Sequence, residues 1–128
     1  MQLTIVSVSG SILPKCQPSV GLVIRDEETG ENMISGMCSG KTLYNGVCHA
    51  FSRMLKSPVS IANMQLLQDN EESGRLLCMT SICFRGKTLK GGCGSGKDFD
   101  KGDELRIFVG AVVDALNTYD DARIVSNQ

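Results

Sequence analysis

The chain has few of the residues on which nucleic-acid and metal sites usually depend. It contains no tryptophan, two tyrosines and a single histidine among its 128 residues. The scarcity of aromatic residues argues against a platform that stacks bases, and the single histidine and the wide spacing of the cysteines argue against a zinc site. The net charge of −1 argues against a basic surface that binds phosphate backbones. We therefore expect no nucleic-acid partner, no metal and no cofactor.

Long apolar runs are also missing. No run approaches the roughly 20 apolar residues that a membrane helix needs. The first ten residues, MQLTIVSVSG, lack the basic region that is typical of a secretory signal. We therefore expect no membrane partner and a cytoplasmic location. The length fits a single domain that spans residues 1–128.

The six cysteines include no C-x-x-C motif. Cys48, Cys78 and Cys83 stand among apolar residues, where a free thiol behaves as a small hydrophobic side chain. We expect these three side chains in the core, and we expect all six cysteines to be reduced thiols, as is usual in the cytoplasm.

Hydrophobic periodicity predicts six strands and two helices. The strands are expected at residues 2–9, 19–25, 31–37, 59–68, 75–84 and 87–91, and the helices at 41–56 and 103–118. In the first helix, Leu43, Val47 and Phe51 recur at helical intervals, and Pro58 follows its end. This order predicts an α+β fold in which two helices pack on antiparallel sheet.

An internal repeat relates the two halves of the chain. Repeat one covers about residues 19–56 and repeat two about 75–118; each is predicted to be a hairpin, a glycine-rich loop and a helix. We therefore expect two pseudo-symmetric β-β-α repeats with flanking strands. Cys38 and Cys93 occupy equivalent positions in the two loops, and they would form a redox-sensitive site if they met in space.

The glycine-rich stretches resemble phosphate-binding loops without matching them. Residues 91–98 read GGCGSGKD, with Asp98 where a P-loop has the serine or threonine that holds magnesium. Residues 35–42 read SGMCSGKT, in which Gly36 lies one residue too close to Gly40 and Lys41. Glycines before a helix favour an anion at the helix start, whether phosphate or carboxylate. The other interpretation is a tight connection that needs glycine only for its geometry.

No catalytic constellation emerges from the titratable residues. Cys48 and His49 are adjacent in a predicted helix, where neighbouring side chains diverge and cannot pair as nucleophile and base. Asp98, Asp100 and Asp103 crowd the second loop and could hold a cation, although helix capping and solubility are simpler roles. We therefore expect a domain that is not an enzyme.

Several segments carry a family likeness. They are LTIVSVSG followed by SVGLVIRD at the start, the glycine loop at 36–41, the Gly92-Cys93-Gly94 stretch, and AVVDALN at 111–117. In these segments the chain resembles the C-terminal regulatory domain of the α-isopropylmalate synthases and citramalate synthases. The similarity spans most of residues 3–117.

The resemblance implies a dimeric domain that binds leucine or isoleucine as a feedback inhibitor, between subunits and near the glycine loops and helix starts. The ligand-binding residues that it implies are Gly36, Gly40, Thr42, Met64, Gly92 and Gly94. In the family the chemistry belongs to a separate barrel domain, so this chain would regulate such a synthase catalytic domain rather than catalyse. The alternative is a structural or protein-interaction module with no small ligand.

Overall fold

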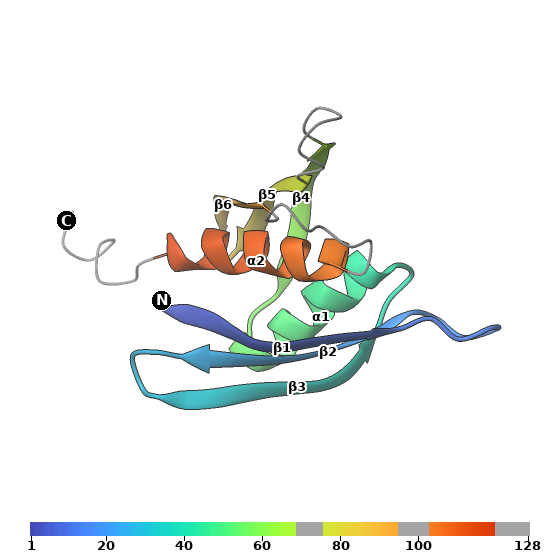
Figure 1. Cartoon of the computed structure of the whole chain (residues 1–128). Helices are drawn as coiled ribbons and strands as arrows, with labels where there is room; N and C mark the ends of the chain where they lie inside the picture. Colours follow the sequence, from blue (N-terminus) through green and yellow to red (C-terminus); the bar gives the residue numbers. More distant parts are fainter. Residues whose placement is uncertain (69–75, 95–102, 120–128) are drawn as a thin grey trace.

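The computed structural model describes residues 1–68, 76–94 and 103–119, which form six strands and two helices (Figure 1). In chain order the elements are β1 (Leu3–Ser11), β2 (Ser19–Asp26), β3 (Glu31–Ser39), α1 (Leu43–Leu55), β4 (Val59–Gln68), β5 (Leu76–Phe84), β6 (Lys87–Gly94) and α2 (Asp103–Asn117). Neither helix in these ranges is long and apolar enough to cross a membrane.

The strands form two antiparallel sheets of three strands each. The first sheet has the order β1-β2-β3, and the second has the order β4-β5-β6. Helix α1 packs on β2 and β3, whereas α2 packs on β5 and β6 and also contacts β1. In Figure 1 the first sheet lies beneath both helices and the second lies behind α2. The predicted α+β class, with two helices packed on antiparallel sheet, is confirmed.

Each half of the chain contributes one sheet and one helix in the order β-β-β-α. The pairing of β1 with β2 shifts register between Ile5 and Ser7, and the pairing of β4 with β5 shifts register between Ile61 and Asn63. A register shift of this kind marks a β-bulge, where one strand carries an extra residue opposite its partner. Because both halves carry one in the first strand, each flanking strand is part of its repeat, and the β-β-α core predicted from the sequence extends to β-β-β-α.

Local signals explain where α1 begins and ends. Thr42 is the N-cap, and its hydroxyl oxygen accepts a hydrogen bond from the backbone NH of Asn45 at 3.2 Å. Lys56 ends the helix in the left-handed conformation, with φ 55°. The Ser52 hydroxyl accepts a hydrogen bond from the backbone NH of Val59 at 2.8 Å. This bond fixes the short connection from α1 to β4.

The core lies between the helices and the sheets. Phe51, Phe84 and Phe108 are its largest fully buried side chains. Helix α2 approaches the second sheet most closely at Gly91 in β6, where an added Cβ would overlap the backbone of Ala111 and Ala115. Glycine in a strand often marks such a close approach of another backbone. The small residues of β6 and α2 therefore set the distance between this helix and its sheet.

The end of α2 is tied to the beginning of β1. The Asn117 side chain accepts the backbone NH of Leu3 at 2.8 Å and donates to the Leu3 carbonyl at 3.1 Å. The Met1 ammonium donates to the Tyr119 carbonyl at 2.9 Å. These bonds join the helix of the second repeat to the sheet of the first.

All six cysteines are free thiols. Cys48 and Cys78 are buried, as the sequence predicted, but Cys83 is exposed. That prediction was wrong because Cys83 lies in β5 between Ile82 and Phe84, which both face the core. Alternation along the strand therefore turns Cys83 to the outer face.

Candidate functional site

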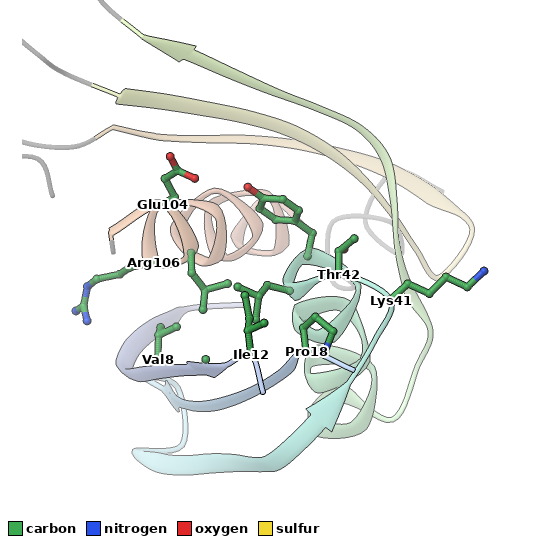
Figure 2. Close-up of a pocket in the computed structure, with 11 residues that line it drawn as sticks. Val8, Ile12, Pro18, Lys41, Thr42, Glu104 and Arg106 are labelled. Atoms are coloured by element: carbon green, nitrogen blue, oxygen red, sulfur yellow. The ribbon is translucent and has the colours of Figure 1, made fainter. Parts of the chain in front are cut away.

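A pocket of about 800 Å³ lies where the N-terminal ends of both helices meet the end of β1 (Figure 2). Strand β1 and the segments that flank β2 and β3 form one side, and the first turns of α1 and α2 form the other. The lining residues are Val8, Gly10, Ile12, Pro18, Lys41, Thr42, Leu43, Tyr44, Glu104, Leu105 and Arg106. This volume lies within the usual range for small-molecule sites, about 300–1,000 Å³.

The apolar wall of the pocket depends on Gly10 in β1. An added Cβ at this position would lie 2.8 Å from Leu105 Cδ2 and 3.4 Å from Leu43 Cδ2. The absence of a side chain therefore lets one leucine from each helix converge over the strand. Val8, two residues earlier, also lines the pocket and is partly buried against the core.

Close backbone packing holds the segment before α1 against the residue that precedes β2 and against the first turns of the helix. The Gly40 NH donates to the Pro18 carbonyl at 3.1 Å, and an added Cβ at Gly40 would lie 2.6 Å from the nitrogen of Gly46. The Thr42 hydroxyl accepts a hydrogen bond from the Asn45 NH. The NH groups of Leu43 and Tyr44, in the same first turn, have no acceptor within the helix. This end of the helix favours a bound anion, as does any exposed helix N-terminus.

Charged and hydroxyl groups surround this apolar wall. Glu104 and Arg106 come from the first turn of α2, and Lys41 precedes α1. Figure 2 shows the Lys41 side chain extending away from the other labelled side chains. The pKa of the Tyr44 phenol is raised, first by burial and then by electrostatic interaction with Glu104 and Cys78. Tyr44 therefore keeps its proton at neutral pH and can donate a hydrogen bond.

The sequence-predicted site residues separate into two groups. Thr42 lines the pocket, and Gly40 lies directly before the lining residue Lys41. The other four do not line it. Gly36 is in β3 with φ +67°, Met64 is in β4 and packs against the core, and Gly92 and Gly94 are in β6.

The predicted glycine loops before the helices begin later than expected, because β3 continues through Gly36 to Ser39 and β6 includes Gly92 and ends at Gly94. Gly36 takes a positive φ within the irregular pairing of β2 with β3, next to the Arg53 guanidinium. In β6 the backbone of α2 lies close at Gly91, whereas a Cβ at Gly92 or Gly94 would meet only atoms of β5, at 3.5 Å or more. A glycine count in the sequence does not distinguish such strand positions from a ligand loop.

Sequence reasoning missed the pocket residues of β1 and α2. Val8, Glu104 and Leu105 read as ordinary strand and helix positions in the sequence. The available signal was the expectation of a ligand at the helix starts, since that expectation applies to the first turn of α2 as well as to α1.

Within the described residues, the remaining sequence candidates show no catalytic or metal-binding geometry. His49 is exposed, and its Nδ1 lies 2.6 Å from the Ser39 carbonyl oxygen, so the ring bonds the end of β3. Across residues 1–68, 76–94 and 103–119, no group of three or more His, Cys, Asp or Glu side chains could hold a metal ion. The GSGKD part of the P-loop-like stretch, including Asp98, lies largely outside these residues, as does Asp100.

No protein-family model matches the chain, and a comparison with curated proteins returns no match. The resemblance to the synthase regulatory domains therefore stays a prediction.

Proposed function

We propose that this chain is a non-catalytic regulatory domain that binds a branched-chain amino acid, such as leucine or isoleucine, in the pocket between the two helix starts. The observation that carries the proposal is the composition of this one pocket. It combines an apolar wall, a carboxylate and an anion-favouring helix N-terminus. An amino acid with an aliphatic side chain presents the complementary three groups.

Each part of such a ligand has a partner in the pocket. The ligand carboxylate would bind the backbone NH groups of Leu43 and Tyr44 at the N-terminus of α1, where a helix favours negative charge. The ligand ammonium would pair with Glu104 at the start of α2. The aliphatic side chain would pack on Val8 and Leu105, and each buried methylene would contribute about 0.8 kcal/mol.

In this proposal the domain is a homodimer that senses the end product for an α-isopropylmalate or citramalate synthase-like catalytic domain. The support is the sequence resemblance together with the β-β-β-α repeat, which places both helix starts at one pocket. The catalytic domain would carry out the reaction, and this domain would bind the amino acid and regulate that reaction.

Calorimetric titration with leucine and two truncated analogues tests the proposed binding mode. 4-Methylpentanoate keeps the carboxylate and side chain but lacks the amine, and 3-methylbutylamine lacks the carboxylate. Leucine should bind, and both analogues should bind at least tenfold more weakly, because each leaves one charged partner unmatched. Equal binding of leucine and both analogues would contradict the assignment of charged groups.

A pair of variants locates the site. Glu104→Gln should weaken leucine binding and leave the weak binding of 4-methylpentanoate unchanged, since that analogue has no ammonium. Glu28→Gln, in the exposed turn between β2 and β3, is the matched control and should change neither. Loss of leucine binding in both variants would place the site elsewhere.

A protein-interaction module is the second candidate, and the outer face of the first sheet favours it. Ile34 in β3 is 72% exposed, and Met37 is 53% exposed and lies over Gly21 of β2. Exposed apolar side chains on a sheet face are typical of protein contacts. This candidate predicts that no amino acid stabilises the fold, and that Ile34→Lys abolishes the dimer measured by sedimentation.

A further inference from the structure

Two cysteines face each other across neighbouring strands of the second sheet. Cys78 in β5 is paired directly with Cys93 in β6. Directly opposed residues in an antiparallel pair have Cα atoms about 4.5–5.5 Å apart. Disulfides span Cα separations of about 4.4–6.8 Å, so this pair meets the backbone requirement for a bond. Cys38 and Cys93, the two cysteines considered together from the sequence, lie in different sheets, in β3 and β6.

The Cys93 side chain packs against α2 and is only partly covered. Its Sγ lies over Gly110 of α2, where an added Cβ would come within 2.6 Å of the sulfur. Cys78 is fully buried, whereas Cys93 is partly exposed. A small oxidant in solvent would therefore reach Cys93 first, and Cys78 would be the second thiol to react.

The internal repeat supplies a comparison within the same molecule. The equivalent pair in the first sheet is Val20 in β2 and Cys38 in β3, which are also directly opposed. The cysteine of the third strand is thus present in both repeats, but its partner is valine in one and cysteine in the other. Packing alone is satisfied by valine, since Val20 is fully buried.

We propose that Cys78 and Cys93 form a reversible modification site, at which a peroxide converts the two thiols into a disulfide that fastens β5 to β6. The Cys93 thiolate attacks one peroxide oxygen and breaks the O–O bond, giving a sulfenic acid and, with hydrogen peroxide, one water. Cys78 sulfur then attacks the Cys93 sulfur and displaces the hydroxyl, which leaves as a second water with the Cys78 proton. The two thiols lose two electrons in total, and the peroxide gains them.

Burial of the two thiols makes this reaction slow at neutral pH. Burial raises the pKa of both thiols, that of Cys78 to about 11. Asp114 on α2 also raises the pKa of Cys93, and Arg106 on the same helix lowers it, while Cys78 faces Tyr44 of α1. Because the thiolate is the reactive form, oxidation should accelerate as pH rises from 7 to 9.

The test uses the full chain with the exposed cysteines replaced, as Cys16→Ser/Cys83→Ser, so that bonds between molecules are avoided. After hydrogen peroxide treatment, two of the four remaining thiols should be lost, and peptide mapping without reductant should join the Cys78 and Cys93 peptides. Reduction should restore both thiols. Cys93→Ser should retain all of its thiols after the same treatment, whereas Cys38→Ser, the control at the equivalent position, should still form the bond.

A gain-of-function variant keeps the proposal testable if Cys93→Ser fails to fold. Val20→Cys places a cysteine opposite Cys38 and should add a second peroxide-induced bond, between residues 20 and 38. Recovery of Cys93 as sulfinic or sulfonic acid with Cys78 still free would overturn the proposal, and so would thiol loss confined to other cysteines.

Discussion

The Asn117 side chain joins the end of α2 to the start of β1. Its side-chain amide bonds both the NH and the carbonyl of Leu3, at 2.8 and 3.1 Å, as a neighbouring strand would. It therefore pairs with the outer edge of β1, which is an edge strand of the first sheet. Buried or partly buried backbone groups that lose a partner cost free energy. This explains why a polar residue ends the otherwise apolar ALN segment of α2.

Asn117→Ala should lower the free energy of unfolding by about 1–3 kcal/mol, because the NH and carbonyl of Leu3 lose their partner. Urea denaturation followed by circular dichroism measures the change. Asn32→Ala, at an exposed position of β3, is the control and should stay within about 0.5 kcal/mol of the wild type. An equal effect of the two substitutions would show that the Asn117 bonds contribute nothing specific.

At the scale of elements, small residues decide how the second helix packs. Gly91 of β6 admits the backbone of α2 at Ala111 and Ala115, and Gly110 of α2 admits the Cys93 sulfur. Helix α1 has a related contact, because an added Cβ at Gly46 would lie 3.1 Å from the Cys38 carbonyl oxygen. In both repeats, then, a glycine in the helix faces the cysteine of the third strand.

Gly91→Ala should destabilise the protein by about 1–3 kcal/mol or more, since the new methyl group would meet backbone atoms that cannot move independently. Gly94→Ala, on the same strand, should be tolerated because its nearest neighbour would be the Leu76 carbonyl oxygen at 3.7 Å. Thermal unfolding of both variants gives the comparison. A stable Gly91→Ala variant would mean that α2 does not pack on β6 as described.

The helices and strands were predictable from the sequence because their periodicity is a local property. Strand β4 has the predicted bounds, and α2 ends one residue before the predicted end. The glycine segments were not predictable in the same way. A glycine at 91 is needed because α2 packs there, and nothing local distinguishes that need from the need of a ligand loop.

At the scale of the whole molecule, the two repeats bring their helix starts to one pocket. Thr42 was predicted as a site residue from the first helix start, and it does line that pocket. Val8 could not be assigned from the sequence, because its proximity to Glu104 and Leu105 depends on how α2 crosses β1. The pocket is thus a property of the assembled fold rather than of any single motif.

The central claim is that this pocket binds a branched-chain amino acid, and thermal unfolding against a ligand panel tests it most directly. The panel comprises leucine, isoleucine, valine, acidic amino acids and Mg-ATP. A ligand present at 100 times its dissociation constant stabilises a fold by about 2.7 kcal/mol, which raises the unfolding temperature by several degrees in a domain of this size. We predict such a rise with leucine or isoleucine and none with Mg-ATP. An unchanged unfolding temperature with every amino acid would contradict the proposal and favour the protein-interaction module.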